Sequence, residues 1–353
     1  MASTTTAPRR RVRAASGGGV NAGHTLAGWL FTAPMIVILG LFLVFPILMA
    51  LYVSFTSWNG NGSPFQGGAN APLVGLRNYT DLFTRDGLMR QTFMQSIGNT
   101  FYYVLFVVPL QTITALGLAL IVNNKFLKGK GFFRTAFYFP SVTSSIAITT
   151  VFLFLFGNSG AVNAFLGLFG IHGPAWFSDP RGLFHLALGA FGIDNPGWAQ
   201  ADVLGRSLWE WLSGPSVAMM VLIFLAIWTT TGTFMLMFLA ALQDLPEDVE
   251  EAAALDGATS WQKLRFVTIP QLRPSIFLVT TLGLIGTWQV FDQVYVTGGG
   301  QPGGTTLTPA YLSYGQSFEE FEYGQGTAIA FIIFLIIVAL TWLQRRFLAE
   351  REG

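Results

Sequence analysis

Six long stretches without a charged residue divide this sequence. They span residues 29–55, 97–122, 135–156, 216–242, 274–291 and 327–342. A charge at the centre of a bilayer costs roughly 2.5–3.5 kcal/mol on insertion scales, and most of the stretches approach or reach the ~17–25 residues that cross about 30 Å of hydrocarbon as a helix. Charged residues make up only 10% of the chain, against roughly 25% in soluble domains. The sequence therefore predicts an all-α polytopic membrane protein with six transmembrane helices.

Basic residues orient the predicted helices. The positive-inside rule places loops rich in Lys and Arg on the cytoplasmic side. With the N-terminus inside, 14 of the 19 basic residues lie in inner loops and tails, and the outer segment 293–325 contains none. This asymmetry predicts that both termini are cytoplasmic. The first stretch is about twice the length of a signal-peptide core, so we expect it to be a retained anchor.

Composition and missing motifs exclude several classes of protein. A formal charge of +1 does not suit a nucleic-acid binder, and the absence of cysteine excludes thiol nucleophiles and Cys-ligated metals. The glycine-rich ATP loop is missing, because Gly129-Lys130 is followed by Gly131. Gly298, Gly300 and Gly303 match the dinucleotide spacing G-x-G-x-x-G, but no strand precedes them, so we interpret the match as chance. The three histidines are scattered, so we expect no metal, no cofactor and no enzymatic site in this chain.

The predicted outer loop 157–215 is unusually long. Its apolar stretch at 183–192 is too short to span a membrane, so we expect a helix that lies on the surface. The loop contains four tryptophans, which suit either the membrane interface or the core of a small domain. They are Trp176, Trp198, Trp209 and Trp211.

The predicted inner loop between the fourth and fifth helices encodes a helical hairpin. Asp244 is a candidate N-cap with Pro246 in the first turn, and Gly257 supplies a stop. A second short helix is expected to begin at Thr259 or Ser260 and to run to Pro270. The loop holds six of the 18 acids, namely Asp244, Glu247, Asp248, Glu250, Glu251 and Asp256. Its acids and alanines suit docking to a basic partner, or equally a solvated amphipathic linker.

This loop resembles the EAA motif (E-A-A-x3-G-x9-I-x-L-P) of permease subunits of binding-protein-dependent ABC importers. Glu251-Ala252-Ala253, Gly257 and Val267-x-Ile269-Pro270 match its spacing, with Val for Ile and Ile for Leu as the differences. The resemblance extends from about residue 26 to 347 and is similar to the sugar-permease branch typified by the maltose and glycerol-phosphate systems. Further matching positions include Pro46, Asn78-Tyr79, Asn99-Thr100, Phe133-Arg134, Pro140 and Gly298-Gly299-Gly300. Gln301 before Pro302 and the long loop 157–215 depart from the family pattern.

The resemblance implies a type I ABC importer-like fold and a domain organisation. We expect a disordered cytoplasmic tail at 1–25, the first transmembrane helix with its outer loop at 26–94, the type-1 permease core at 95–347 and a tail at 348–353. Coupling helices would occupy about 244–270 and dock on an ATPase subunit. The coupling residues are expected to be Glu251, Ala252, Ala253, Asp256 and Gly257.

Polar and aromatic residues in the fourth and fifth stretches are candidates for the substrate pathway, because polar groups facing lipid are costly. The candidates are Thr230, Thr233, Thr287, Trp288, Gln289 and Asp292. Hydroxyls, an amide and aromatic faces suit a sugar. Two alternatives stay open: threonines also pack membrane helices together, and Asp292 suits the outer interface equally well.

The resemblance implies that the chain forms half of the pathway of an ATP-driven carbohydrate importer in a bacterial cell membrane, working by alternating access. Expected partners are a second homologous permease subunit, two ATPase subunits that bind ATP and Mg²⁺, an extracytoplasmic solute-binding protein and the lipid bilayer. No nucleic acid is expected. The alternative is a secondary transporter or channel for a small polar solute, although such proteins favour paired intramembrane carboxylates.

Overall fold

The computed structural model describes residues 22–66, 71–84, 87–124 and 126–349. It is mostly helical, which confirms the predicted all-α class, and it adds one short antiparallel hairpin of β1 (Asp202–Val203) and β2 (Arg206–Ser207). The chain divides into two units, residues 1–52 and 53–353. Of the two predicted tails, residues 1–21 and 350–353 lie outside the described residues.

The described part of the first unit is one apolar helical segment. Helix α1 (Ala22–Leu39) continues through the π-helical turn η1 (Gly40–Val44) into α2 (Phe45–Val53). Residues Ala27–Val53 are long and apolar enough to cross a membrane. This segment corresponds to the first predicted span.

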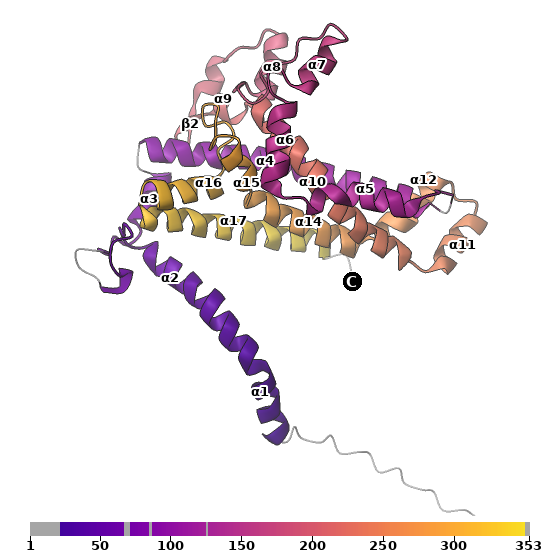
Figure 1. Cartoon of the computed structure of the whole chain (residues 1–353), viewed down its shortest axis with the longest axis horizontal. Coiled ribbons are helices and arrows are strands. Elements are labelled where there is room, and N and C mark those ends of the chain that lie inside the picture. The colour runs from indigo at the N-terminus through magenta and orange to yellow at the C-terminus, as the bar shows by residue number, and fades with distance from the viewer. Residues whose placement is uncertain (1–21, 67–70, 85–86, 125, 350–353) are drawn as a thin grey trace, which may run out of the picture. The chain divides into compact units, whose positions relative to one another are not determined.

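Four further helical segments of the second unit meet the same criteria of length and composition. They are α4 (Leu88–Asn123), α10 (Val217–Gln243), α17 (Tyr323–Ala349), and α14 (Arg273–Trp288) together with α15 (Asp292–Val296). Helix α4 packs against α10 and α14, and α17 packs against α14. Figure 1 shows these helices running alongside one another. Ser216 is the N-cap of α10, because its side chain accepts the Met219 N–H.

The third predicted span is broken in the structure. Residues 135–156 were expected to form one helix, but α5 (Lys130–Val142) and α6 (Ser145–Leu155) meet at a bend of 96°. Thr143 and Ser144 adopt extended ψ angles of 147° and 127° between them. The reason is local, since a proline at 140 followed by hydroxyl and β-branched residues favours caps and turns over a continuous helix. The chain thus has five spanning candidates, or six if the bent pair is one span.

Short elements connect the spanning helices. Before α4 lie η2 (Pro64–Gln66) and α3 (Arg77–Phe83). Segment 157–215 contains α7 (Ala161–Gly167), α8 (Leu183–Ala190), η3 (Gly197–Gln200) and α9 (Leu208–Trp211). Between α10 and α14 lie α11 (Glu247–Leu255), α12 (Ser260–Lys263), η4 (Leu264–Thr268) and α13 (Ile269–Gln271), and before α17 lie α16 (Pro309–Tyr314) and η5 (Gly315–Glu319).

Segment 157–215 contains the short helix expected at 183–192, as α8. Three of its four tryptophans have partners within the protein. Trp209 stacks on His185 with ring centroids 4.1 Å apart, Trp176 donates to the Asn163 side-chain oxygen, and Trp211 donates to the Val203 carbonyl. Trp198 is exposed. Most of these rings therefore pack within a small folded segment. This agrees with the second of the two interpretations of the tryptophans, a small domain, and not with the membrane interface.

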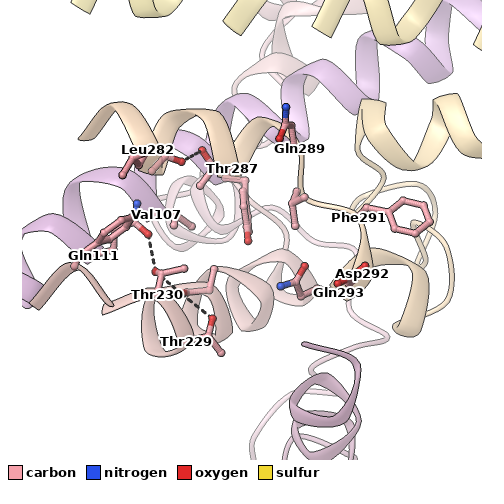
Figure 2. A pocket seen from close by; sticks show the side chains of 16 residues that line it. Val107, Gln111, Thr229, Thr230, Leu282, Thr287, Gln289, Phe291, Asp292 and Gln293 are labelled. Carbon is pink, nitrogen blue, oxygen red and sulfur yellow. Dashed lines mark hydrogen bonds between the residues drawn. The ribbon is translucent and has the colours of Figure 1, made fainter. Parts of the chain in front are cut away.

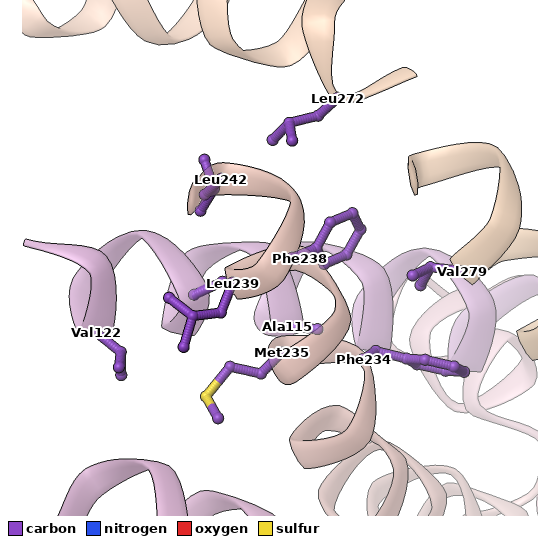
Figure 3. Close-up of a cluster of buried hydrophobic side chains, with 10 residues drawn as sticks. Ala115, Val122, Phe234, Met235, Phe238, Leu239, Leu242, Leu272 and Val279 are labelled. Atoms are coloured by element: carbon purple, nitrogen blue, oxygen red, sulfur yellow. The ribbon is translucent and has the colours of Figure 1, made fainter. Parts of the chain in front are cut away.

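Two buried apolar clusters hold the bundle together around its middle. One joins α4, α10 and α14 through residues such as Ala115, Phe234, Phe238 and Val279, as Figure 3 shows. The other joins α4, α10 and the α14–α15 region through Tyr103, Leu222, Val290 and others. Members of both clusters, Phe234 of the first and Tyr103 and Val290 of the second, line a polar cavity.

Candidate functional site

A cavity of about 260 Å³ lies between α4, α10 and α14. Its walls come from Tyr103, Val107 and Gln111 on α4, from residues 226–234 of α10, and from Leu282, Gly283, Gly286 and Thr287 on α14. Residues 289–293 complete the lining (Figure 2). Asp292 is the one charged residue among those that line it. A lining of amides and hydroxyls with a single carboxylate suits an uncharged polar solute.

One hydrogen bond crosses the cavity wall from α10 to α4. The Thr230 hydroxyl donates to Gln111 Oε1 at 2.7 Å, as Figure 2 shows. Gln111 is only 1% exposed, and its Nε2 has no partner among the described residues. Gly283 makes room for this amide, because a Cβ at that position would collide with Gln111 Nε2. A buried amide with a free N–H is costly, so this group is a candidate polar contact beside the cavity.

A second cavity of about 290 Å³ adjoins the first along α10, at the bend between α5 and α6. Hydroxyl side chains dominate its polar lining, and they are Ser141, Thr143, Ser145, Thr149, Thr229, Thr230 and Thr233. The two cavities share Thr229, Thr230, Phe234 and Gln293. The bend that broke the third predicted span therefore adds a second polar space next to the first.

The structure brings together most of the predicted pathway residues. Thr230, Thr287, Gln289 and Asp292 line the first cavity, and Thr233 lines the second. Trp288 lies outside both linings and is buried in an apolar cluster that includes Phe93. The Thr287 hydroxyl bonds to the Gly283 carbonyl of its own helix. The structure thus shows where each predicted pathway residue lies. Contact of these residues with a substrate stays a prediction.

Sequence reasoning missed two amides that line the cavity. Gln111 lies in the middle of α4, where a polar side chain in an apolar stretch is itself an indication of function. Gln293 follows Asp292 and borders both cavities. Their positions relative to α10 come from helix packing, which the sequence pattern does not specify.

The predicted helical hairpin is present, with one correction at its start. Asp244 is not the N-cap of α11 but the C-cap of α10, because its N–H bonds to the Ala240 carbonyl and α10 continues to Gln243. Pro246, with ψ 126°, is the N-cap residue and makes no side-chain bond. Gly257 ends the helix as expected, at φ +76°, where glycine avoids the strain of a Cβ.

The second half of the hairpin begins as predicted. Thr259 caps α12, and Gln262 reaches back so that a full capping box forms. The helical path then passes through η4 and α13 to Gln271, just beyond Pro270. In Figure 1 the hairpin of α11 and α12 lies at one end of the bundle, and α3 lies at the other.

The hairpin, defined here as residues 247–263, exposes apolar as well as acidic groups. Leu255 is 89% exposed and Trp261 is 65% exposed. Glu251, Ala252 and Asp256 are also exposed. Large apolar side chains that are open to solvent beside carboxylates are typical of a surface that meets another protein.

Apolar spanning helices, a polar cavity between them and an exposed amphipathic hairpin are features of a membrane transport protein. Residues 87–350 match the family described as "Binding-protein-dependent transport system inner membrane component". The chain belongs to this family. It is a membrane-spanning permease subunit of an ABC importer, and the ATPase is a separate partner in that family.

Curated relatives agree with this assignment over nearly the whole chain. The "Lactose transport system permease protein LacF" of Rhizobium radiobacter is 33% identical over 332 residues, covering 93% of this chain and 95% of the relative. The "Multiple sugar-binding transport system permease protein MsmF" of Streptococcus mutans serotype c is 30% identical over 319 residues, covering 90% and 93%. These matches support the importer and not the secondary transporter or channel.

Solved structures confirm the type I ABC importer fold. A chain of a bacterial ABC transporter involved in the import of the acidic polysaccharide alginate has a TM-score of 0.70 and 20% sequence identity. The match covers 94% of this chain and 99% of that one. At this identity the likeness concerns the fold alone.

Proposed function

We propose that this chain forms half of the translocation pathway for a neutral carbohydrate, working by alternating access. The observation that carries the proposal is the cavity between α4, α10 and α14, whose polar groups are amides and hydroxyls with Asp292 as the one charge. Sugar hydroxyls both donate and accept hydrogen bonds, so they match such groups. The sugar-transport names of the relatives support the same substrate class.

The energy for transport is assigned to two separate ATPase subunits, which bind the ATP and Mg²⁺. The hairpin 247–263 would dock on one of them, with Glu251 facing a basic residue and Ala252 and Ala253 allowing close approach. The exposed Leu255 supports this role, because a solvated linker gains nothing from an 89% exposed leucine. ATP-driven closure of the ATPase pair then favours one of two states of the bundle.

Each copy of this chain has one hairpin of residues 247–263, and the number of hairpins indicates which further partners are needed. Two ATPase subunits need two hairpins, so a second, homologous permease subunit completes the membrane part. A solute-binding protein delivers the sugar on the extracytoplasmic side, opposite to the hairpin. Both termini of this chain are then cytoplasmic, which agrees with the 14 basic residues of the inner loops and tails.

Reconstituted transport tests the proposal. The chain is co-purified with its second permease and ATPase subunits and placed in proteoliposomes with ATP on the hairpin side and the solute-binding protein on the other. We expect uptake of labelled neutral saccharides that requires both ATP and the binding protein. Failure of any ATPase to co-purify in mild detergent, or sugar uptake driven by an ion gradient without ATP, would contradict it.

A further inference from the structure

Aromatic side chains continue from the first cavity along the neighbouring helices. We call this set the aromatic row, and its members are Phe291, Tyr295, Tyr311, Tyr314, Phe318 and Tyr323. Phe291 lines the cavity and its ring lies 5.1 Å from that of Tyr314. Tyr314 lies 5.2 Å from Phe318, and Phe318 lies 5.7 Å from Tyr323, with distances measured between ring centroids. The row thus runs without a break from the cavity through α16 and η5 to the start of α17.

Two rings of the row are more than half exposed, and the other four are half-buried. Tyr295 is 51% exposed and Phe318 is 58% exposed. In Figure 2 the Phe291 ring points away from Thr230 and Gln111. A contiguous set of exposed aromatic rings is typical of a binding surface.

Charge around the row identifies the kind of ligand. Glu319, Glu320 and Glu322 are exposed beside it, and the Tyr311 hydroxyl donates to Glu319 Oε1 at 3.4 Å. No Lys or Arg occurs between residues 274 and 344. Carboxylates and tyrosine hydroxyls accept hydrogen bonds from sugar hydroxyls, while the negative charge repels an anionic ligand. Lipid tails are disfavoured as the occupant, because carboxylates are costly in hydrocarbon.

We propose that the aromatic row is a binding track for the trailing rings of a neutral oligosaccharide whose leading ring occupies the cavity. The inference rests on the proposed carbohydrate function and extends it. At about 260 Å³ the cavity is smaller than the roughly 300–1,000 Å³ typical of sites for drug-sized ligands, so the further rings of a longer saccharide would extend beyond it. The apolar C–H faces of those rings stack on aromatic faces, and their hydroxyls bond to the tyrosines and carboxylates.

Two phenylalanines of equal exposure provide the test. Phe318 belongs to the row, whereas Phe321 is also 58% exposed but makes no ring contact among the described residues. Phe318→Leu and Phe321→Leu are compared with the wild type as complete importers in proteoliposomes. Uptake is measured for glucose- and galactose-based neutral saccharides of one to four rings and for trigalacturonate as an anionic probe.

We expect Phe318→Leu to raise the half-saturating concentration of three- and four-ring saccharides roughly three- to tenfold, as the loss of one stacking contact implies. The one-ring values and all values of Phe321→Leu should stay within about twofold of the wild type. Three results would overturn the proposed track. Phe318→Leu could affect short and long saccharides equally, or the importer could take up trigalacturonate as well as the neutral probes. The third is loss of the second permease subunit from the purified Phe318→Leu complex. A wild-type importer that takes up only one-ring sugars would also overturn the track, whereas one that takes up no saccharide contradicts the carbohydrate function itself.

Discussion

Gln111 on α4 and Thr230 on α10 are joined by a 2.7 Å hydrogen bond at the wall of the cavity. Beside it, the hydroxyl of Thr231, the next residue of α10, lies 3.1 Å from that of Thr114, three residues further along α4, and forms a second polar contact. The two spanning helices are thus connected by polar pairs in the part of the bundle that also borders the cavity. Gln111 and Thr230 thus contribute both to the packing of α4 against α10 and to the polar lining of the cavity. Substitutions at these positions and at neighbouring control positions distinguish the two roles.

Thr230→Val should destabilise the chain by about 1–3 kcal/mol, because it leaves the buried Gln111 oxygen without a donor. Thermal unfolding of the detergent-solubilised complex measures the effect. Thr229→Val is the matched control, since the Thr229 hydroxyl bonds only to carbonyls of its own helix. A double variant with Gln111→Leu should recover part of the loss, and equal costs for the two threonines would contradict a role for the interhelical bond.

Gly283→Ala should reduce transport strongly. Its Cβ would collide with Gln111 Nε2, so either the amide moves or α14 shifts away from α4. Gly286→Ala on the same helix is the control, because nothing lies within 4 Å of a Cβ there although the residue also lines the cavity. Uptake and thermal stability of both variants are compared, and similar losses would show that cavity volume matters more than the Gln111 position.

Gly257→Val should uncouple ATP hydrolysis from transport while leaving membrane insertion intact. Gly257 has φ +76°, and an L-residue in this left-handed region costs roughly 1–2 kcal/mol, so the hairpin would change its turn. Space is not the cause, since nothing lies within 4 Å of a Cβ at this position. Gly257→Asn should retain more coupling, because asparagine tolerates this conformation better.

The readout is the ratio of sugar uptake to ATP hydrolysis in proteoliposomes. We expect this ratio to fall several-fold for Gly257→Val and to fall less for Gly257→Asn. Wild-type transport by purified complexes that carry Gly257→Val would refute the coupling role of the hairpin.

Acid should loosen segment 157–215 through Asp179. Hydrogen bonds from the Arg181 side chain hold the pKa of this carboxyl below its usual value of about 3.9, against the opposing effect of burial. The ion pair lies where the Asp179 and Arg181 carbonyls accept the Ala218 and Val217 N–H groups at the start of α10. Because the folded-state pKa is lowered, the stabilisation is complete above the unfolded-state pKa and is lost as pH falls through the folded-state value.

Proteolysis within segment 157–215 measures this loss. Wild-type protein should become more sensitive as the pH falls below about 4, the usual pKa of an aspartate, and Asp179→Asn should already be sensitive at pH 7 with little further change in acid. Asp194→Asn, an exposed carboxylate of the same segment without an ion pair among the described residues, should behave as wild type. An identical acid response of Asp179→Asn and wild type would contradict the assignment.

The sequence predicted most features that depend on local chemistry. Charge-free stretches located the spanning helices, because burial of charge in hydrocarbon is costly at any position in a span. The hairpin was found from Gly257 and from the Thr259–Gln262 capping box, both of which act over a few residues. Asp244 was misplaced because two adjacent helices compete for the same residue, and the longer helix α10 extends through it.

Tertiary structure decided the features that depend on which faces meet. Trp288 and Thr287 are neighbours in sequence, yet Trp288 enters an apolar cluster while Thr287 borders the cavity, because successive residues of a helix point about 100° apart. The bend between α5 and α6 and the pairing of Gln111 with Thr230 likewise required the packed bundle. Composition and spacing thus predicted a helical membrane protein with a helical hairpin between its fourth and fifth spans, whereas the position and lining of its cavity came from helix packing, since contacts between residues more than a hundred positions apart leave no periodic pattern in the chain.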